Sequence, residues 1–257
     1  EDYKDDDQSR FSEYRNYNHD IQVMMRFIRQ KYNLNFGVMV QPQQSKYIQD
    51  YQGVHVDTVR NVVNVSPTLD FRYRFSKMSN LRINYRGTTS QPSISQLLDI
   101  TDNSDPLNIS MGNPGLKPSF TQNFRLFYNN FVQNHNKGIM TFVNFSTTNN
   151  SISNKVTYDE TTGGRITRPE NINGNWNAMG AFMFNCSIDS AGVWNINTGA
   201  HANYNNYVSY LSLDKKSDSQ KNTTRSITWR QNLSLSYRND WAEFSLDGTL
   251  TYNKAKN

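Results

Sequence analysis

The sequence has one cysteine, Cys186, and few aliphatic residues for its length. A single cysteine excludes an internal disulfide and a zinc site made of thiolates, so we expect a small packed residue. Hydrophobic residues make up only 35% of the 257 residues, less than an ordinary soluble core of this length requires. Aromatic residues still reach 13%, which is more than a disordered chain contains. This combination is typical of strands that alternate polar and apolar residues.

Long apolar runs and clustered charges are also missing. No run approaches the roughly 18 apolar residues of a transmembrane helix, and no signal peptide is recognisable. The formal net charge is +5, but the basic residues form no stripe of the kind that binds nucleic acid. We therefore expect no nucleic-acid partner.

No catalytic or metal-binding constellation stands out. The four histidines are scattered and have no metal-ligand spacing: His19, His55, His135 and His201. The sequence thus predicts no metal, no cofactor and no enzyme. A hydrolase site formed by His201 on an inward strand face with serines elsewhere in the chain is an alternative that we do not favour, because no clustered His/Ser/Asp set is present.

Alternation is the dominant pattern. In 31–41, Tyr32, Phe36 and Val40 fall on one strand face, and Asn33 and Asn35 fall on the other. The same pattern predicts about ten strands, most of them about 9–14 residues long: 20–29, 31–41, 61–75, 80–86, 119–131, 138–148, 174–186, 192–205, 225–238 and 241–253.

The connections between these strands alternate between short and long. Long polar segments are expected at 42–60, 87–118, 149–173 and 206–224, with short turns between them. Soluble strands usually run to about 5–6 residues, whereas a tilted strand needs about 9–11 to cross a bilayer. The sequence therefore predicts an all-β fold, an antiparallel transmembrane β-barrel segment with short periplasmic turns and long extracellular loops. A soluble all-β ligand-binding module remains the alternative.

The expected barrel segment covers 20–257. We expect 1–19, which begins with the acidic stretch EDYKDDDQ, to be a loop or partial segment. Both ends interrupt the strand pattern, so we expect part of a longer protein and an arc of a larger barrel. Aromatic residues near the strand ends suit the two bilayer interfaces, although aromatics are common in strands generally: Trp194, Tyr237 and Trp241 flank short turns, and Trp176, Tyr204 and Trp229 lie nearer the long loops.

Arginines dominate the polar strand faces. Side chains alternate between the two sides of a strand, and this alternation (strand parity) places the following arginines on one side: Arg26, Arg72, Arg74, Arg82, Arg86, Arg125 and Arg230. The few acidic residues on that side are Asp70, Glu243 and Asp247. Charges are costly toward lipid and acceptable in a lumen, so this side should face inward. Two roles fit: pairing with acids of a plug domain, which we favour, or attracting anionic solutes.

Segment 86–128 carries three elements in order: Pro92–Leu97, the Asp105-Pro106 pair and Gly112–Pro118. In this arrangement the chain resembles the β-barrel region of TonB-dependent outer-membrane receptors of the Bacteroidota type. The loop residues that carry the resemblance are Pro92, Gln96, Leu97, Gly112, Asn113, Pro114, Lys117 and Pro118. The prolines fix φ and the glycines permit tight turns, so we expect a rigid return into the next strand. The Gly112–Pro118 element could serve only to shape the loop, or it could contact a ligand directly; the sequence leaves both roles open.

The resemblance implies a receptor in the outer membrane of a Gram-negative bacterium that binds and imports a glycan, a peptide or a metal chelate. It also implies partners: the lipid bilayer, the receptor's own plug, the TonB energy-coupling complex and, in some members, a surface lipoprotein. The sequence departs from the family in lacking a recognisable plug and the usual terminal aromatic residue. We therefore expect a middle-to-late portion of the barrel.

Overall fold

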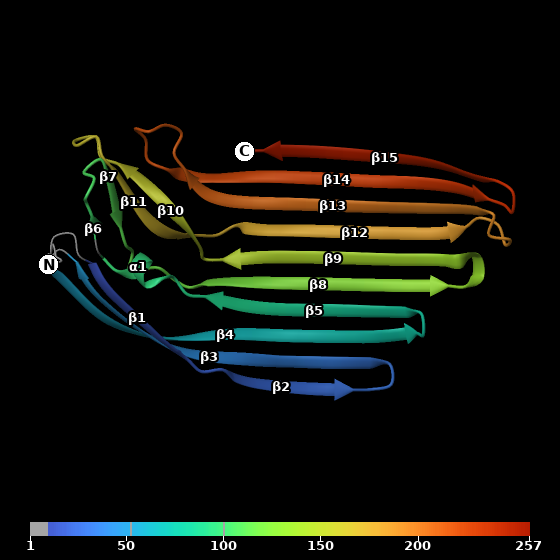
Figure 1. Ribbon diagram of the computed structural model, residues 1–257, viewed down its shortest axis with the longest axis horizontal. Coiled ribbons are helices and arrows are strands. Elements are labelled where there is room, and N and C mark those ends of the chain that lie inside the picture. Colours follow the sequence, from blue (N-terminus) through green and yellow to red (C-terminus); the bar gives the residue numbers. More distant parts are fainter. Residues whose placement is uncertain (1–9, 52, 100) are drawn as a thin grey trace, which may run out of the picture.

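The computed structural model describes residues 10–51, 53–99 and 101–257, which form one long antiparallel sheet and a smaller sheet at one of its ends (Figure 1). The long sheet comprises β1 (Arg10–Asn18), β2 (Ile21–Ile28), β3 (Tyr32–Tyr51), β4 (Val54–Ser76), β5 (Ser79–Ser90), β8 (Ser119–Val132), β9 (Lys137–Asn149), β12 (Asn175–Ser187), β13 (Trp194–Leu211), β14 (Gln220–Arg238) and β15 (Glu243–Lys256). The small sheet comprises β6 (Thr101–Asp102), β7 (Asn108–Met111), β10 (Ser151–Tyr158) and β11 (Arg165–Ile172). The helical elements are α1 (Ile94–Leu97) and the 3₁₀ turn η1 (Asn134–Asn136).

The long sheet is a meander in which neighbours in space are neighbours along the sequence, apart from the insertions of the small sheet. All ten predicted strands are present in it, and each adjacent pair is antiparallel. The short turns lie together at one end of the sheet, and α1 and the small sheet lie at the other (Figure 1). The predicted separation into a trimmed end and an elaborated end is confirmed.

The expectation of a loop over 1–19 is wrong for residues 10–18, which form β1; residues 1–9 lie outside the described part of the chain. β1 and β2 pair with the same edge of β3 in one unbroken register. Between them the His19 amide donates to the Pro42 carbonyl at 3.0 Å. Pro42 has no N–H to return a ladder bond, so the edge strand is interrupted at this point.

The long connections are more ordered than we expected. Most of 42–60 is strand, because β3 and β4 continue as a hairpin to Tyr51 and from Val54. Most of 206–224 is also strand, because β13 runs to Leu211 and β14 begins at Gln220. Segment 149–173 contributes β10 and β11 to the small sheet, where β7 joins β11 in parallel. The alternating pattern predicted the strand lengths that are needed to cross a bilayer. The strands of the structure continue past these lengths into the segments that we predicted to be loops.

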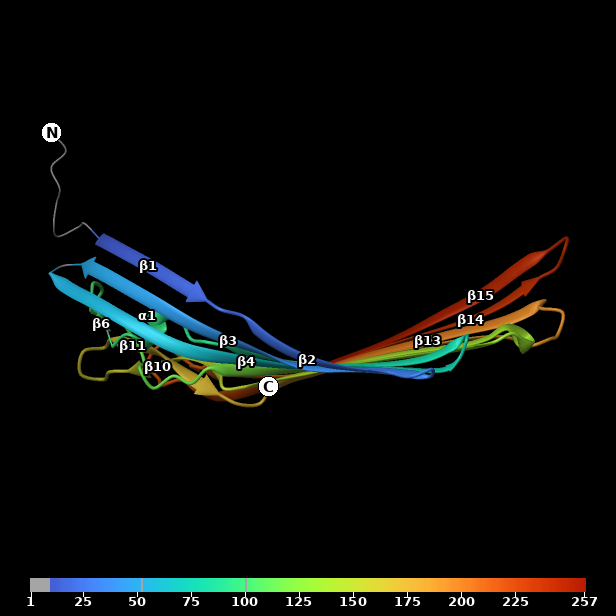
Figure 2. The same ribbon diagram turned by 90° about the horizontal axis from the view of Figure 1, so that it is seen from below.

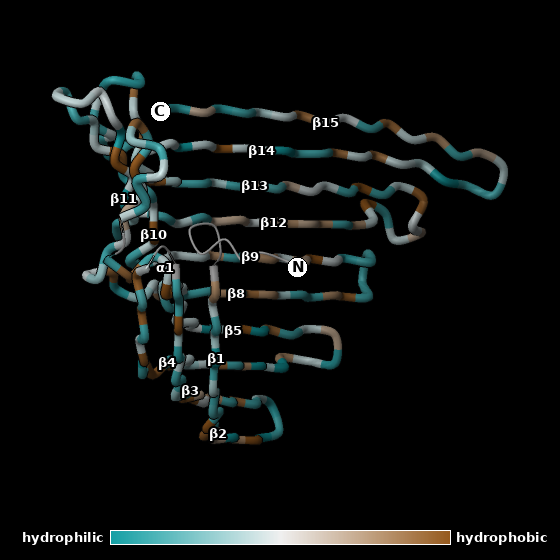
Figure 3. The backbone as a smooth tube through the Cα atoms, turned by 60° about the vertical axis from the view of Figure 1, so that its left-hand side comes forward, coloured by the Kyte–Doolittle hydropathy of each residue, from teal (hydrophilic) through white to brown (hydrophobic). Residues whose placement is uncertain are grey.

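The molecule has almost no interior. Among the described residues, the buried hydrophobic side chains are Leu116, Ile172 and Val208. Side chains such as Val65, Leu233 and Leu250 are 41%, 51% and 63% exposed. Figure 3 shows hydrophilic and hydrophobic residues alternating along the long strands. The apolar residues therefore do not form a two-layer core, which is what a soluble sandwich would require.

The long sheet is twisted and staggered. Seen from below, β1 and β15 run at different inclinations (Figure 2). The hydrogen-bonded row that begins at Tyr32 passes through Tyr73 and Tyr128 and reaches Gln231 in β14. β3 starts at this row, whereas β14 continues from Gln231 to Arg238. Such a shift of the strand ends is the shear that tilted strands of a barrel require.

Among the described residues, no helix is long and apolar enough to cross a bilayer.

Candidate functional site

The strand register collects the predicted arginines on one face, called here the polar face. Arg26, Asn35, Asp70, Asn84 and Arg125 follow one another across five strands on a single row. Because cross-strand partners share a face, these five side chains lie on the same side of the sheet.

The other predicted arginines join the same face from neighbouring rows. Arg72 lies directly opposite Arg82. Arg86, Arg74 and Arg230 lie opposite Thr68, Asn80 and His201, respectively. Strand parity alone was therefore enough to place all of these side chains.

Asp70 is the acid at the centre of this group. Its Oδ2 lies 3.6 Å from a guanidinium nitrogen of Arg72 and 3.5 Å from one of Arg82. The two arginine side chains are about half exposed, so each pair contributes at most about 1 kcal/mol. One carboxylate facing two guanidinium groups leaves this part of the polar face cationic.

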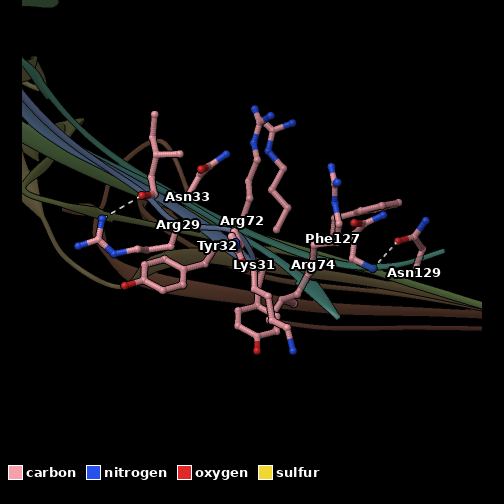
Figure 4. Close-up of a pocket in the computed structure, with 14 residues that line it drawn as sticks. Arg29, Lys31, Tyr32, Asn33, Arg72, Arg74, Phe127 and Asn129 are labelled. Atoms are coloured by element: carbon pink, nitrogen blue, oxygen red, sulfur yellow. Dashed lines mark hydrogen bonds between the residues drawn. The ribbon is translucent and has the colours of Figure 1, made fainter. Parts of the chain in front are cut away.

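A basic hollow of about 520 Å³ lies where β3, β4 and β5 meet the short turns. Its cationic lining residues are Arg29, Lys31, Arg72, Arg74 and Arg82, and the described residues that line it include no Asp or Glu. In Figure 4, Arg72 and Tyr32 extend to opposite sides of the sheet. The Arg74 amide donates to the Lys31 carbonyl at 2.7 Å, which holds the turn against β4. The hollow is suited to an acidic or anionic partner.

The opposite face, called the apolar face, carries two belts of aromatic rings. One belt is continuous across five strands, with ring centroids 4.8–6.1 Å apart: Tyr85, Phe124, Phe145, Trp176 and Tyr204. The other lies nearer the short turns and contains Tyr32, Phe71, Tyr73, Phe75 and Tyr128, with Trp194 against Tyr237 at 4.8 Å farther along. Rings with a polar edge suit the two interfaces of a bilayer.

The predicted loop elements meet at the elaborated end. In the first, Pro92 precedes α1, and the Ser93 amide donates to Gln96 Oε1 at 3.0 Å, which caps the helix start. Leu97 is the last residue of α1. In the second, Asp105 accepts hydrogen bonds from Asn108 Nδ2 and the Leu107 amide. These bonds lower the pKa of the Asp105 carboxyl. The second element is therefore a turn that is held by hydrogen bonds to the Asp105 side chain.

The Gly112–Pro118 element joins these loops to the small sheet. The Asn113 amide donates to the Gln96 carbonyl at 2.6 Å, and Asn113 Nδ2 donates to the Pro169 carbonyl at 2.9 Å. A Cβ on Gly112 would stand 1.6 Å from the Leu98 carbonyl oxygen, so only glycine fits there. Leu116 is buried, whereas Pro114, Lys117 and Pro118 are exposed. The structure thus gives this element a rigid, connecting position.

The start of the same loop is anchored to the polar face of the β3–β4 hairpin. Arg60 donates to the Pro92 carbonyl and to Gln91 Oε1, each at 2.8 Å. Gln91 donates in turn to Asn64 at 2.9 Å. Burial lowers the pKa of the Arg60 guanidinium, but a guanidinium remains charged at neutral pH. We define the outer platform as 91–118 together with β10 and β11.

The histidines and the cysteine lie apart from carboxylate clusters in the described part of the chain. Within the described ranges, no three His, Cys, Asp or Glu side chains come together as a metal site. His201 lies on the polar face between Ala181 and Arg230, without a carboxylate on its row in these two neighbouring strands. Cys186 is a free, partly exposed thiol near a short turn, rather than the packed residue that we expected.

A comparison with known protein families agrees with a sheet that has one polar and one apolar face. A model of the outer membrane protein β-barrel family matches residues 3–257. The chain belongs to this family. No curated protein is detectably similar to it. Membership places the chain in the outer membrane of Gram-negative bacteria and in contact with the lipid bilayer.

Membership also orients the sheet. In outer-membrane barrels the apolar side faces lipid and the polar side faces the lumen. The short turns are then periplasmic, and the outer platform is extracellular. Two features were not predicted from the sequence. One is the pairing of Asp70 with two arginines. The other is a second hollow beside the outer platform, lined in part by residues of 47–56, a segment for which we predicted a loop and therefore assigned no strand faces.

Proposed function

We propose that the chain forms part of the barrel wall of a TonB-dependent receptor that binds a solute and imports it across the outer membrane. The observation that carries this proposal is the cationic lumenal face around Arg72, Arg82 and Asp70. A wide aqueous pore would leave these groups to water. A plug with acidic groups would instead form charge-assisted hydrogen bonds with the guanidinium groups.

The outer platform supports the same proposal. Its elements in 86–128 carry the resemblance to TonB-dependent receptors, and their hydrogen bonds build a fixed structure at the mouth of the wall. Such a structure is suited to capture a solute before it enters the lumen. The partners that the proposal requires are a plug domain and the inner-membrane complex that supplies energy; a surface lipoprotein is compatible with it.

Attraction of anionic solutes is the second role for the arginines. The basic hollow favours it to the extent that five cationic residues are among those that line it. This hollow lies at the periplasmic end of the sheet, however, where a solute would arrive last. We therefore assign the arginines to the plug first.

Reversing charge at the basic hollow tests the proposal in the intact protein. Arg72→Glu with Arg74→Glu should repel acidic groups of the plug and open the lumen, so cells should become sensitive to vancomycin, which the outer membrane normally excludes. The matched control is Lys215→Glu with Lys216→Glu, the same change in charge on the connection between β13 and β14.

The expected result is sensitivity with the first pair of changes and none with the second, at equal amounts of receptor in the outer membrane. If the Arg72/Arg74 variant still excludes vancomycin, the arginines do not hold a plug and the proposal loses its main support.

A further inference from the structure

A second hollow of about 460 Å³ lies between the β3–β4 hairpin and the outer platform. This volume is within the range of about 300–1,000 Å³ that is usual for small-molecule sites. The hairpin contributes Tyr47, Gln49, Val54 and Val56 to its lining. The platform's contribution includes Thr101, Asp102, Asn103, Ser110, Met111 and Gly112.

The hollow opens on the lumenal side of the wall. β3 and β4 pair in one unbroken register from Tyr32 to Tyr51. Tyr47 and Gln49 are an even number of residues from Asn35, so they share its face. Figure 2 shows α1 and β6 beside the same ends of β3 and β4. A ligand held here would stand at the extracellular mouth, on the side that leads inward.

The walls of the hollow are fixed in advance. Arg60 ties the loop start to the hairpin through Pro92 and Gln91. Gly112 lies so close to the Leu98 carbonyl that the two halves of the platform are in backbone contact. A preformed site loses little conformational entropy when a ligand binds, which favours binding.

The lining combines an aromatic ring and apolar side chains with amides and hydroxyl groups. Tyr47 donates its hydroxyl hydrogen to Gln49 Oε1, which leaves the Gln49 amide hydrogens as donors for a ligand. The Tyr47 ring, Val56 and Met111 supply apolar surface. Among the described residues that line the hollow, Asp102 carries the only charge.

We infer that this hollow binds a neutral saccharide of one or two rings; the inference rests on the proposed solute-binding function. Pyranose rings have an apolar face that packs on an aromatic ring, and hydroxyl groups that exchange hydrogen bonds with amides and hydroxyls. Anionic solutes are disfavoured because the described residues that line the hollow include no cationic side chain. A peptide with free ends would bring two charges, and the backbone edge offered by β6 is only two residues long.

Calorimetry on the purified full-length protein in detergent tests the inference. The neutral probes are cellobiose, lactose and maltose; lactobionate is the anionic counterpart of lactose, and acetyl-Ala-Ala-Ala-amide is the peptide probe. At least one neutral disaccharide should bind. Tyr47→Ala and Gln49→Leu should each weaken its binding about tenfold, the size of one lost contact or hydrogen bond.

The control is Tyr17→Ala, which removes a more exposed tyrosine ring from β1 without touching the hollow. Tyr47→Phe retains the ring and guards against misfolding as the cause of a loss. The inference is overturned if no neutral disaccharide binds, if lactobionate or the peptide binds more tightly, or if Tyr47→Ala has no effect. Binding requires no energy coupling, so a failure here is distinct from a failure of the vancomycin test.

Discussion

Asp189 holds the periplasmic turn between β12 and β13 together. Its carboxylate accepts hydrogen bonds from the Trp194 amide at 2.8 Å and the Val193 amide at 3.2 Å. These bonds, the one from Trp194 first, lower the pKa of the Asp189 carboxyl. The ionised form is therefore favoured in the folded turn.

The lowered pKa predicts a pH dependence for this turn. The stabilisation should be complete above about pH 4, the range of an unfolded aspartate, and should disappear as pH falls through the lowered value. Hydrogen exchange of the Trp194 amide, corrected for its intrinsic rate, should lose protection in that acidic window. Asp189→Asn should flatten the profile; an unchanged acidic loss in that variant would contradict the prediction.

The sequence predicted on which face of the sheet an individual side chain lies, wherever side chains alternate along a strand. Parity alone placed Arg72, Arg82 and Arg125 on one face. It did not reveal that Asp70 lies between Arg72 and Arg82, because that requires the register between β4 and β5. It also gave no partner for Arg60, whose hydrogen bonds are to a loop 31 and 32 residues away.

Among the larger elements, the small sheet is connected to the long sheet in part through Asn171. The Asn171 side chain accepts from the Lys117 amide at 2.8 Å and donates to the carbonyls of Lys117 and Asn150 at 2.9 and 3.0 Å. One side chain thus joins β11 to the segments that precede β8 and follow β9.

Asn171→Ala should release this connection. Each lost hydrogen bond costs about 1 kcal/mol, and one such loss raises the open population about fivefold. Exchange of the Lys117 amide should accelerate by at least that factor, whereas Asn154→Ala, on the exposed side of β10, should leave it unchanged. Equal rates in the two variants would show that other contacts hold the small sheet in place.

Whether a strand could be predicted depended on how far along the chain its pairing partner lies. Alternation within one segment predicted all ten strands of the meander. It could not show where β3 and β13 end, because pairing continues outside the bilayer with the same period. The small sheet was missed because β7 and β11 pair across a long stretch of intervening chain, and short segments such as β6 have no periodicity to read.

At the scale of the whole molecule, the sheet is a wall with different solvents on its two sides. The belt at Tyr204 lies on the same row as Ile227 of β14, and Trp194 of the other belt contacts Tyr237. Leu233 lies between these two positions on the apolar face and is 51% exposed. It therefore marks the middle of the hydrocarbon layer.

A charge at Leu233 should disrupt assembly, whereas the same charge one residue further along should not. Arginine on the lipid face near the midplane costs about 2–4 kcal/mol, so Leu233→Arg should lower the amount of folded protein in the outer membrane. Ser234→Arg places the guanidinium on the lumenal face, opposite Asp247, where water and a carboxylate accommodate it. Heat-modifiable mobility of outer-membrane fractions measures the folded amount. Equal folding of the two variants would mean that lipid does not cover the apolar face, and the assignment of the two faces would then be wrong.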